Sequence, residues 1–136
     1  MTGFQLDILT PERPFFSGEA ETLVVTCSDG ERAVLRGHAP MLTPLSAGML
    51  KIKQNGNRRV AFQSEGFLET DADGVRVFLQ SCEWVEDIDA ARAERAAQIA
   101  YETMRQKQSM AEYHAAQMTL ARAMARLRIK QNSRGY

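Results

Sequence analysis

The chain has 136 residues, of which 44% are hydrophobic and 25% charged, and its formal net charge is zero. That composition is typical of a globular protein with one domain or two very small ones, and no apolar run is long enough for a transmembrane helix. Only two cysteines occur, far apart and without metal-ligand spacing, which argues against a zinc site or a disulfide framework. The first residues enter a strand pattern with no signal core, so we expect a reducing, cytosol-like compartment.

The sequence changes character at residues 88–93. All four prolines and eight of the nine glycines precede this stretch, and neither residue type occurs from Asp87 to Arg134. Because proline and glycine interrupt helices, we expect turn-rich β-structure before the change and helix after it. We therefore predict a β domain at residues 1–86 and a helical domain at residues 87–136. The second domain is small enough to be a candidate moving part.

Charge is distributed unevenly between these two parts. Residues 1–86 carry 8 Lys and Arg against 12 Asp and Glu, whereas residues 87–136 carry 9 against 5. From Leu120 onward the chain has no acidic residue and five basic ones: Arg122, Arg126, Arg128, Lys130 and Arg134. Such a run suits an acidic protein surface or a polyphosphate, and equally a solvated helix end that complements its own dipole.

Short alternating or β-branched segments fill the beginning of the chain. We expect strands at residues 4–9, 15–18, 21–26 and 32–35, with a turn at residues 28–31. Residues 37–44 contain a glycine and two prolines, which exclude helix and indicate an ordered loop.

The strongest local signal is Asn55-Gly56 between two alternating segments, residues 49–54 and 57–63. Asn-Gly adopts the positive φ angles of a tight turn, so we predict a β-hairpin there. A second hairpin is expected from residues 66–81, with its turn at residues 71–74. Eight or nine short antiparallel strands spaced by turns predict a sandwich or a flattened barrel.

Two stripes of apolar residues at helical spacing follow residue 88. The first stripe comprises Ala93, Ala97, Ala100 and Met104, and the second comprises Tyr113, Ala116, Leu120, Ala123 or Met124, and Leu127. Asp89 is placed to cap the first helix. The polar link at residues 106–109 is so short that the helices must run antiparallel, and their alanine-rich faces bury little area. We predict an α+β protein: an antiparallel β-sandwich followed by a two-helix hairpin of limited stability, a candidate two-state element.

No residue pattern indicates catalysis or a metal site. His38 lacks an accompanying Ser or Cys nucleophile motif, so we interpret it as structural or interfacial. Glycine-rich phosphate loops are missing from the sequence, which argues against conventional nucleotide hydrolysis. We interpret Cys27 and Cys82 as small apolar residues on strands, and Trp84 as packing between the two domains.

Four charged residues of the helical part form a candidate anion site. Asp89 and Arg92 stand three apart, for which a surface ion pair is the simplest interpretation. Arg122 and Arg126 share one face of the second helix. Since an antiparallel hairpin brings the start of one helix beside the end of the other, three guanidinium groups would meet a helix N-terminus. Forked donors and the positive end of the helix dipole favour phosphate there.

Six segments, in their order and spacing, carry a resemblance to a known family. They are residues 4–12 (FQLDILTPE), 16–18 (FSG), 37–43 (GHAPMLT), 48–50 (GML), 66–69 (GFLE) and 88–93 (IDAARA). Over nearly its whole length the chain resembles the epsilon subunit of bacterial and chloroplast F-type ATP synthases, which is equivalent to the mitochondrial delta subunit.

The resemblance implies an N-terminal sandwich of about ten strands and a C-terminal helical hairpin. It implies a non-catalytic subunit of the central stalk that binds the gamma subunit and the c-ring and couples proton flow to ATP synthesis. Its expected place is peripheral, on the cytoplasmic side of the bacterial plasma membrane, without insertion into the membrane. The extended hairpin is expected to enter the alpha/beta catalytic head and inhibit ATP hydrolysis. Glu31, Arg32, Arg36 and His38 are expected to contact the rotor ring.

Some members of this family bind ATP on the closed hairpin through the pattern Ile/Leu-Asp-x-x-Arg-Ala and arginines of the second helix. The resemblance therefore implies these candidate nucleotide-binding residues: Glu83, Ile88, Asp89, Arg92, Ala93, Arg122 and Arg126. ATP is expected as a regulatory ligand that favours the closed state, and no cofactor is expected to be required.

Two alternatives belong to other functional classes. The chain is alternatively an autonomous nucleotide-sensing module whose main role is ATP binding at the hairpin. Nucleic-acid binding is disfavoured, because the basic end lacks interleaved aromatic residues and the net charge is zero.

Overall fold

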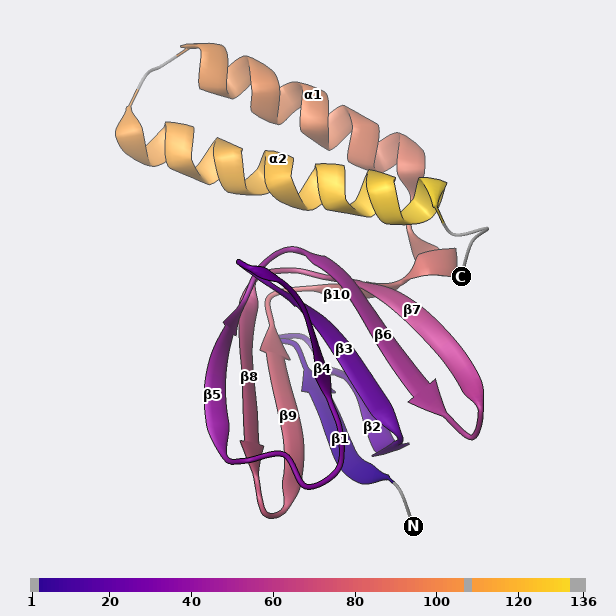
Figure 1. Ribbon diagram of the computed structural model, residues 1–136. Coiled ribbons are helices and arrows are strands. Elements are labelled where there is room, and N and C mark those ends of the chain that lie inside the picture. The colour runs from indigo at the N-terminus through magenta and orange to yellow at the C-terminus, as the bar shows by residue number, and fades with distance from the viewer. Residues whose placement is uncertain (1–2, 107–108, 133–136) are drawn as a thin grey trace.

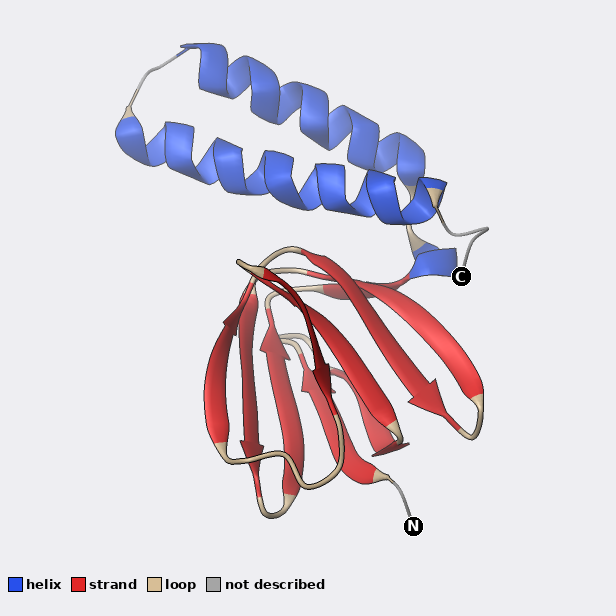
Figure 2. Ribbon diagram, viewed as in Figure 1, coloured by secondary structure: helices blue, strands red, loops and turns tan. Residues whose placement is uncertain are grey.

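The computed structural model describes residues 3–106 and 109–132. Two five-stranded sheets pack into a β-sandwich, and a helical hairpin lies across one end of it (Figure 1). Helices and strands are fully segregated along the chain, as Figure 2 shows. The α+β fold, a sandwich followed by a two-helix hairpin, is confirmed.

The first sheet has the strand order β2-β1-β9-β8-β5. Its strands are β1 (Phe4–Leu9), β2 (Pro14–Ala20), β5 (Met41–Leu45), β8 (Gly66–Asp71) and β9 (Gly74–Leu79). The second sheet has the order β10-β7-β6-β3-β4. Its strands are β3 (Thr22–Cys27), β4 (Gly30–Val34), β6 (Gly48–Gln54), β7 (Asn57–Gln63) and β10 (Cys82–Trp84).

Alternating burial along the strands builds the core between the sheets. Inward-facing side chains alternate with outward ones on β1, β3, β6 and β9, as a half-buried strand requires. The core is therefore aliphatic, and its fully buried members include Leu6, Ile8, Leu23, Val25, Val34, Leu50, Ile52 and Val77. The predicted Asn-Gly hairpin is confirmed between β6 and β7, with φ of 54° at Asn55 and 77° at Gly56.

Three features of the sheets differ from the sequence expectation. The segment expected as a loop over residues 37–44 contains β5, an edge strand that tolerates Pro44 because an edge position has a free side. β10 was not expected, since three residues are too few to show alternation. β1 pairs with β9 in parallel, whereas every other pairing in the two sheets is antiparallel among the described residues.

The two helices form the predicted antiparallel hairpin. α1 (Ala90–Gln106) and α2 (Met110–Gln131) follow the 3-10 helix η1 (Val85–Asp87), which joins them to β10. Ala93 and Ala100 of α1 and Ala116 and Ala123 of α2 are buried, whereas Met124, the alternative to Ala123, is 48% exposed. Within the described residues, no helix has the length and hydropathy to cross a membrane.

The ends of the helices are capped by side chains. Asp89 Oδ1 accepts a hydrogen bond from the Arg92 backbone N–H at 3.1 Å, as expected for an N-cap. Ser109 Oγ caps α2 in the same way by accepting from the Glu112 N–H at 3.0 Å. Residues 107–108 of the predicted link, and Arg134 of the basic run, lie outside the described residues.

The hairpin rests on the second sheet through a small apolar cluster. Ala125 and Ile129 of α2 pack with Val60 and Phe62 of β7 and with Ile88, and Ala47, Met49 and Val85 border them. This cluster is separate from the main sandwich core. The hairpin therefore has its own, much smaller hydrophobic contact with the sandwich.

Candidate functional site

A cavity of about 570 Å³ lies where the sandwich meets the hairpin. It is bordered by the start of β2, by β10, by the start of α1 and by the end of α2. Five of the seven candidate nucleotide residues line it: Glu83, Asp89, Arg92, Ala93 and Arg126. The antiparallel hairpin thus brings the start of α1 beside the end of α2, as the sequence predicted.

Arg126 is the most constrained of these five residues. Its Nε donates to Glu83 Oε1 at 2.8 Å and to Oε2 at 3.4 Å, and its Nη2 donates to Ser81 Oγ at 3.4 Å. Its guanidinium carbon also lies 4.3 Å from the centre of the Phe62 ring, which adds a cation–π contact. The Arg126 guanidinium is therefore already hydrogen-bonded to the Glu83 carboxylate, and a phosphate would need the same donors.

Arg122 and Ile88 lie outside the cavity. Arg122 Nη1 donates to Glu65 Oε1 at 2.6 Å, and its Nη2 donates to Thr119 Oγ1 at 3.3 Å. Ile88 is 4% exposed and belongs to the apolar cluster beneath α2. The structure therefore does not bring three guanidinium groups to one helix N-terminus, because Arg122 is directed toward the sandwich instead.

The charges around the cavity are mixed. Its carboxylates are Glu12, Glu83, Asp87 and Asp89, and its guanidinium groups are Arg13, Arg92 and Arg126. A bare triphosphate would meet more acidic than basic side chains unless some of these pairs reorganise. No cluster of His, Cys, Asp and Glu suited to a metal ion occurs among residues 3–106 and 109–132.

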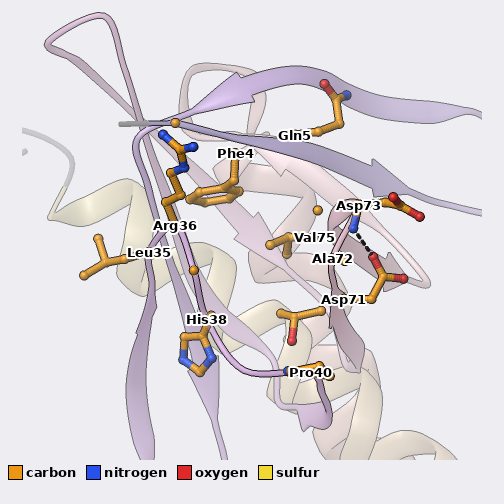
Figure 3. A pocket seen from close by; sticks show the side chains of 14 residues that line it. Phe4, Gln5, Leu35, Arg36, His38, Pro40, Asp71, Ala72, Asp73 and Val75 are labelled. Carbon is orange, nitrogen blue, oxygen red and sulfur yellow. Dashed lines mark hydrogen bonds between the residues drawn. The ribbon is translucent and has the colours of Figure 1, made fainter. Parts of the chain in front are cut away.

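A second cavity, of about 410 Å³, lies beside the β8–β9 turn (Figure 3), which is at the end of the sandwich away from the hairpin (Figure 1). Arg36 and His38 stand on one side of it, in the connection between β4 and β5, and Asp71 and Asp73 of the β8–β9 turn stand on the other. Two of the four predicted rotor-contact residues are thus exposed together beside acidic side chains.

The other two predicted rotor-contact residues lie on β4, before this connection. Glu31 is exposed and pairs with Lys51 Nζ at 3.8 Å. Arg32 Nη1 donates to Thr43 Oγ1 on β5 at 3.4 Å, which links the edges of the two sheets. Glu31 and His38 are therefore separated by the length of β4.

Ion pairs join strands β8 and β9 next to the β8–β9 turn. Arg76 donates to Glu69 Oε1 at 2.6 Å and also pairs with Asp71. The hydrogen bond from Arg76, followed by that from the Asp73 N–H, lowers the pKa of Asp71. The hydrogen bonds to Asp71 and Glu69 in turn raise the pKa of Arg76. Asp71 therefore stays charged to a lower pH than an ordinary aspartate does.

Trp84 packs against the sandwich rather than between the two domains. Its ring lies 4.5 Å from that of Phe15 and 6.4 Å from that of Phe16 on β2, and the Arg59 guanidinium lies 3.5 Å above it. These contacts join the edge strands β2 and β10 of opposite sheets. The sequence position of Trp84 beside the junction suggested the wrong partner, because β10 was not recognised as a strand.

An exposed apolar patch on the first sheet was missed from the sequence. Leu42 on β5 is 70% exposed and Phe67 on β8 is 52% exposed. The register places Pro44 opposite Phe67 and Phe67 opposite Phe78, so these four residues share the outer face of the sheet. Residues Met41–Leu45 contain the apolar side chains of this patch on β5. Because the segment was interpreted as a loop, its outward-facing side chains could not be identified.

Two family models together match almost the entire chain. The beta-sandwich domain of the ATP synthase delta/epsilon chain matches residues 3–85, and the long alpha-helix domain of the same chain matches residues 86–131. The chain belongs to the ATP synthase delta/epsilon family. The junction between the two matches falls within η1, next to the cavity that gathers five of the candidate nucleotide residues.

Curated relatives extend over nearly the full length of this delta/epsilon chain. The ATP synthase epsilon chain of Caldanaerobacter subterraneus subsp. tengcongensis is 45% identical over 127 residues, covering 93% of this chain and 92% of the relative. That of Chromohalobacter salexigens is 40% identical over 135 residues, covering 98% and 96%. The family member described here is accordingly an accessory chain of ATP synthase and not one of its catalytic chains.

Solved structures of distant sequence share the delta/epsilon fold. A chain of the Euglena gracilis mitochondrial ATP synthase superposes with a TM-score of 0.77 at 18% identity, covering 98% of this chain and 82% of that one. A chain of the Tetrahymena thermophila mitochondrial ATP synthase, in a structure of its central stalk and c-ring, gives 0.68 at 12% identity, covering 93% and 96%.

Proposed function

We propose that this chain is a subunit of the central stalk of a proton-translocating ATP synthase, where it couples rotation to ATP synthesis. Its place is peripheral, on the cytoplasmic side of a bacterial plasma membrane. Family membership carries the proposal, together with the fold it shares with a chain seen in a central stalk and c-ring structure. The gamma subunit and the c-ring are the partners.

The apolar patch formed by Leu42, Pro44, Phe67 and Phe78 is the proposed contact with the gamma subunit. Large exposed hydrophobic side chains gathered on one face are a common feature of interaction sites. This patch includes two of the most exposed large apolar residues of the described sandwich. The edge strand β5 also leaves one row of backbone groups available for a partner.

The c-ring is proposed to contact the residues around the second cavity and along β4. Arg36 and His38 present exposed polar groups opposite Asp71 and Asp73, so a partner loop that carries both charge signs fits between them. Glu31 and Arg32 extend the predicted contact along β4.

The hairpin is proposed to be the regulatory element that inhibits ATP hydrolysis by extending into the alpha/beta head. The small size of its contact with the sandwich supports this role. Ala125 and Ile129 are the described α2 residues in the shared apolar cluster, and a contact of that size is compatible with reversible opening. Opening would expose Met49, Val60 and Phe62 on the second sheet.

The binding of a gamma subunit tests the proposed place in the stalk. Replacing Leu42 and Phe67 together by aspartate should weaken binding of purified gamma at least about a hundredfold, since each charge must be desolvated in an apolar contact. Ile99→Asp is the matched control, because Ile99 is 68% exposed on α1, away from this patch. Unchanged binding of the double variant would refute the assignment of the patch.

Regulatory ATP binding at the hairpin is the second candidate function. It is favoured by the convergence of Glu83, Asp89, Arg92, Ala93 and Arg126 on one cavity. Calorimetry of the full chain with ATP should then give heat that disappears in Arg92→Ala and Arg126→Ala. No heat at any accessible ATP concentration would remove this role while leaving the stalk function in place.

A further inference from the structure

The apolar contact that docks the hairpin is accompanied by two ion pairs. Arg122 and Arg126 stand one turn apart on α2 and reach different parts of the sandwich. Arg122 binds Glu65, in the connection between β7 and β8, at 2.6 Å, and Arg126 binds Glu83 of β10 at 2.8 Å. Together the two contacts fix the rotation and the axial position of α2 on the sandwich, because the two arginines pair with carboxylates at different places on it.

All four side chains are partly shielded from water. Their exposed fractions are 27% for Arg122, 29% for Glu65, 23% for Arg126 and 31% for Glu83. Pairs shielded to this degree are screened by salt less than pairs on the open surface. Removing one partner leaves the other charge poorly solvated, which costs more than the intact pair contributes.

The free-energy cost of losing Arg122 falls on the closed state alone, because of the position of Glu65. Its Oε1 accepts from Arg122, whereas its Oε2 is buried and has no hydrogen-bond partner among the described residues. Without Arg122 the carboxylate would remain half-desolvated as long as α2 covers it. Departure of the hairpin would return it to water, so loss of Arg122 favours opening.

We propose that Arg122–Glu65 and Arg126–Glu83 form an arginine clamp that holds the hairpin closed in the absence of any ligand. The inference rests on the proposed mobile hairpin and adds what determines its resting position. Opening must break both pairs. A phosphate that binds Arg126 must first displace Glu83, so nucleotide and Glu83 compete for one guanidinium group.

The clamp therefore separates two influences on the hairpin. In the absence of nucleotide, the ion pairs that Glu65 and Glu83 make with α2 determine the population of the closed hairpin. Any nucleotide effect is reduced by the competition at Arg126, whereas Arg122 lies outside the cavity and acts on nucleotide binding only through the closed population. Glu83→Gln should therefore loosen the clamp and at the same time make Arg126 more available to an anion.

Methyl relaxation-dispersion NMR of Met49 in the full chain tests the clamp, because this method measures minor states and Met49 borders the cluster under α2. Arg122→Ala and Arg126→Ala should each raise the open population about tenfold or more. The charge-exchanged variant Glu65→Arg with Arg122→Glu should return it close to the wild-type value. Arg128→Ala, an exposed position on the same helix, is the control and should leave it unchanged.

Ile129→Ala provides the reference for opening, since Ile129 is 3% exposed in the docking cluster. If Ile129→Ala raises the open population and neither arginine variant does, the clamp is wrong and the mobile hairpin stands. An exchanged pair that stays as open as Arg122→Ala would also overturn the clamp. If no variant raises the open population, the hairpin does not open in the isolated chain, and both the clamp and the mobile hairpin are refuted.

Discussion

Replacing Ile129 by alanine should undock the hairpin while leaving the sandwich folded. Ile129 is 3% exposed and packs with Ala125, Val60, Phe62 and Ile88 in a cluster separate from the main core. Truncation of a buried isoleucine to alanine costs roughly 2–5 kcal/mol in a protein core. Because this cluster is small and lies at the edge of the sandwich, we expect the lower part of that range.

A cost of about 2–3 kcal/mol corresponds to a shift of roughly 30- to 140-fold in the ratio of closed to open hairpin. The open population follows from methyl relaxation dispersion of Met49. Unfolding of the sandwich follows from the fluorescence of Trp84, which packs on Phe15 and Arg59 within it. Denaturation monitored by Trp84 should have nearly the wild-type midpoint in the Ile129→Ala variant.

Met124→Ala is the matched control, since Met124 lies on the same helix and is 48% exposed. It should change the closed-to-open ratio by less than about twofold, as expected for a surface substitution. The reasoning would be refuted if Ile129→Ala lowered the sandwich midpoint and left the open population unchanged. In that case hairpin and sandwich would unfold as one cooperative unit.

Three further outcomes follow from individual residues. Gly66→Ala should lower the free energy of unfolding by about 3 kcal/mol or more in chemical denaturation, because its Cβ would press against the Phe78 carbonyl oxygen; an unchanged midpoint contradicts this. Asp71→Asn should be less stable than the wild type at neutral pH. The folded-state pKa of Asp71 lies below its ordinary value of 3.8. In a pH series of thermal melts, the stability difference between the two proteins should therefore persist above pH 3.8 and vanish as the pH falls through the lowered pKa. Burial, followed by the Glu83 charge, raises the pKa of Cys82, so its alkylation by iodoacetamide at neutral pH should be at least about tenfold slower than in urea; equal rates would show that the thiol is accessible.

Local signals in the sequence were sufficient for most of the fold. Asn55-Gly56 determined the β6–β7 hairpin because few residue pairs adopt two successive positive φ angles. The alanines at positions 93, 100, 116 and 123 identified the faces on which the two helices meet, since their spacing follows the helical period. Both signals depend only on neighbours in the chain.

The features that were missed depend on contacts distant in sequence. β5 and β10 are strands because of their partners β8 and β7, and neither segment has enough alternation to show this by itself. The parallel pairing of β1 with β9 joins segments about seventy residues apart and leaves no local pattern.

The sequence also predicted only part of the candidate site. Asp89 and Arg92 came together with Arg126 because the antiparallel hairpin required it. Arg122 was expected beside them from its spacing on α2, but its direction is set by Glu65, 57 positions away in the chain. Helical periodicity places a residue on a face, and only the tertiary structure determines which carboxylate it meets.

ATP hydrolysis by the assembled synthase tests the central proposal most directly. The complex would be prepared with the full chain or with a chain truncated after Glu86, which keeps the sandwich and removes both helices. We predict that the truncated chain still assembles with gamma and that hydrolysis by the complex rises. Unchanged hydrolysis in a complex that contains the truncated chain would contradict a regulatory hairpin.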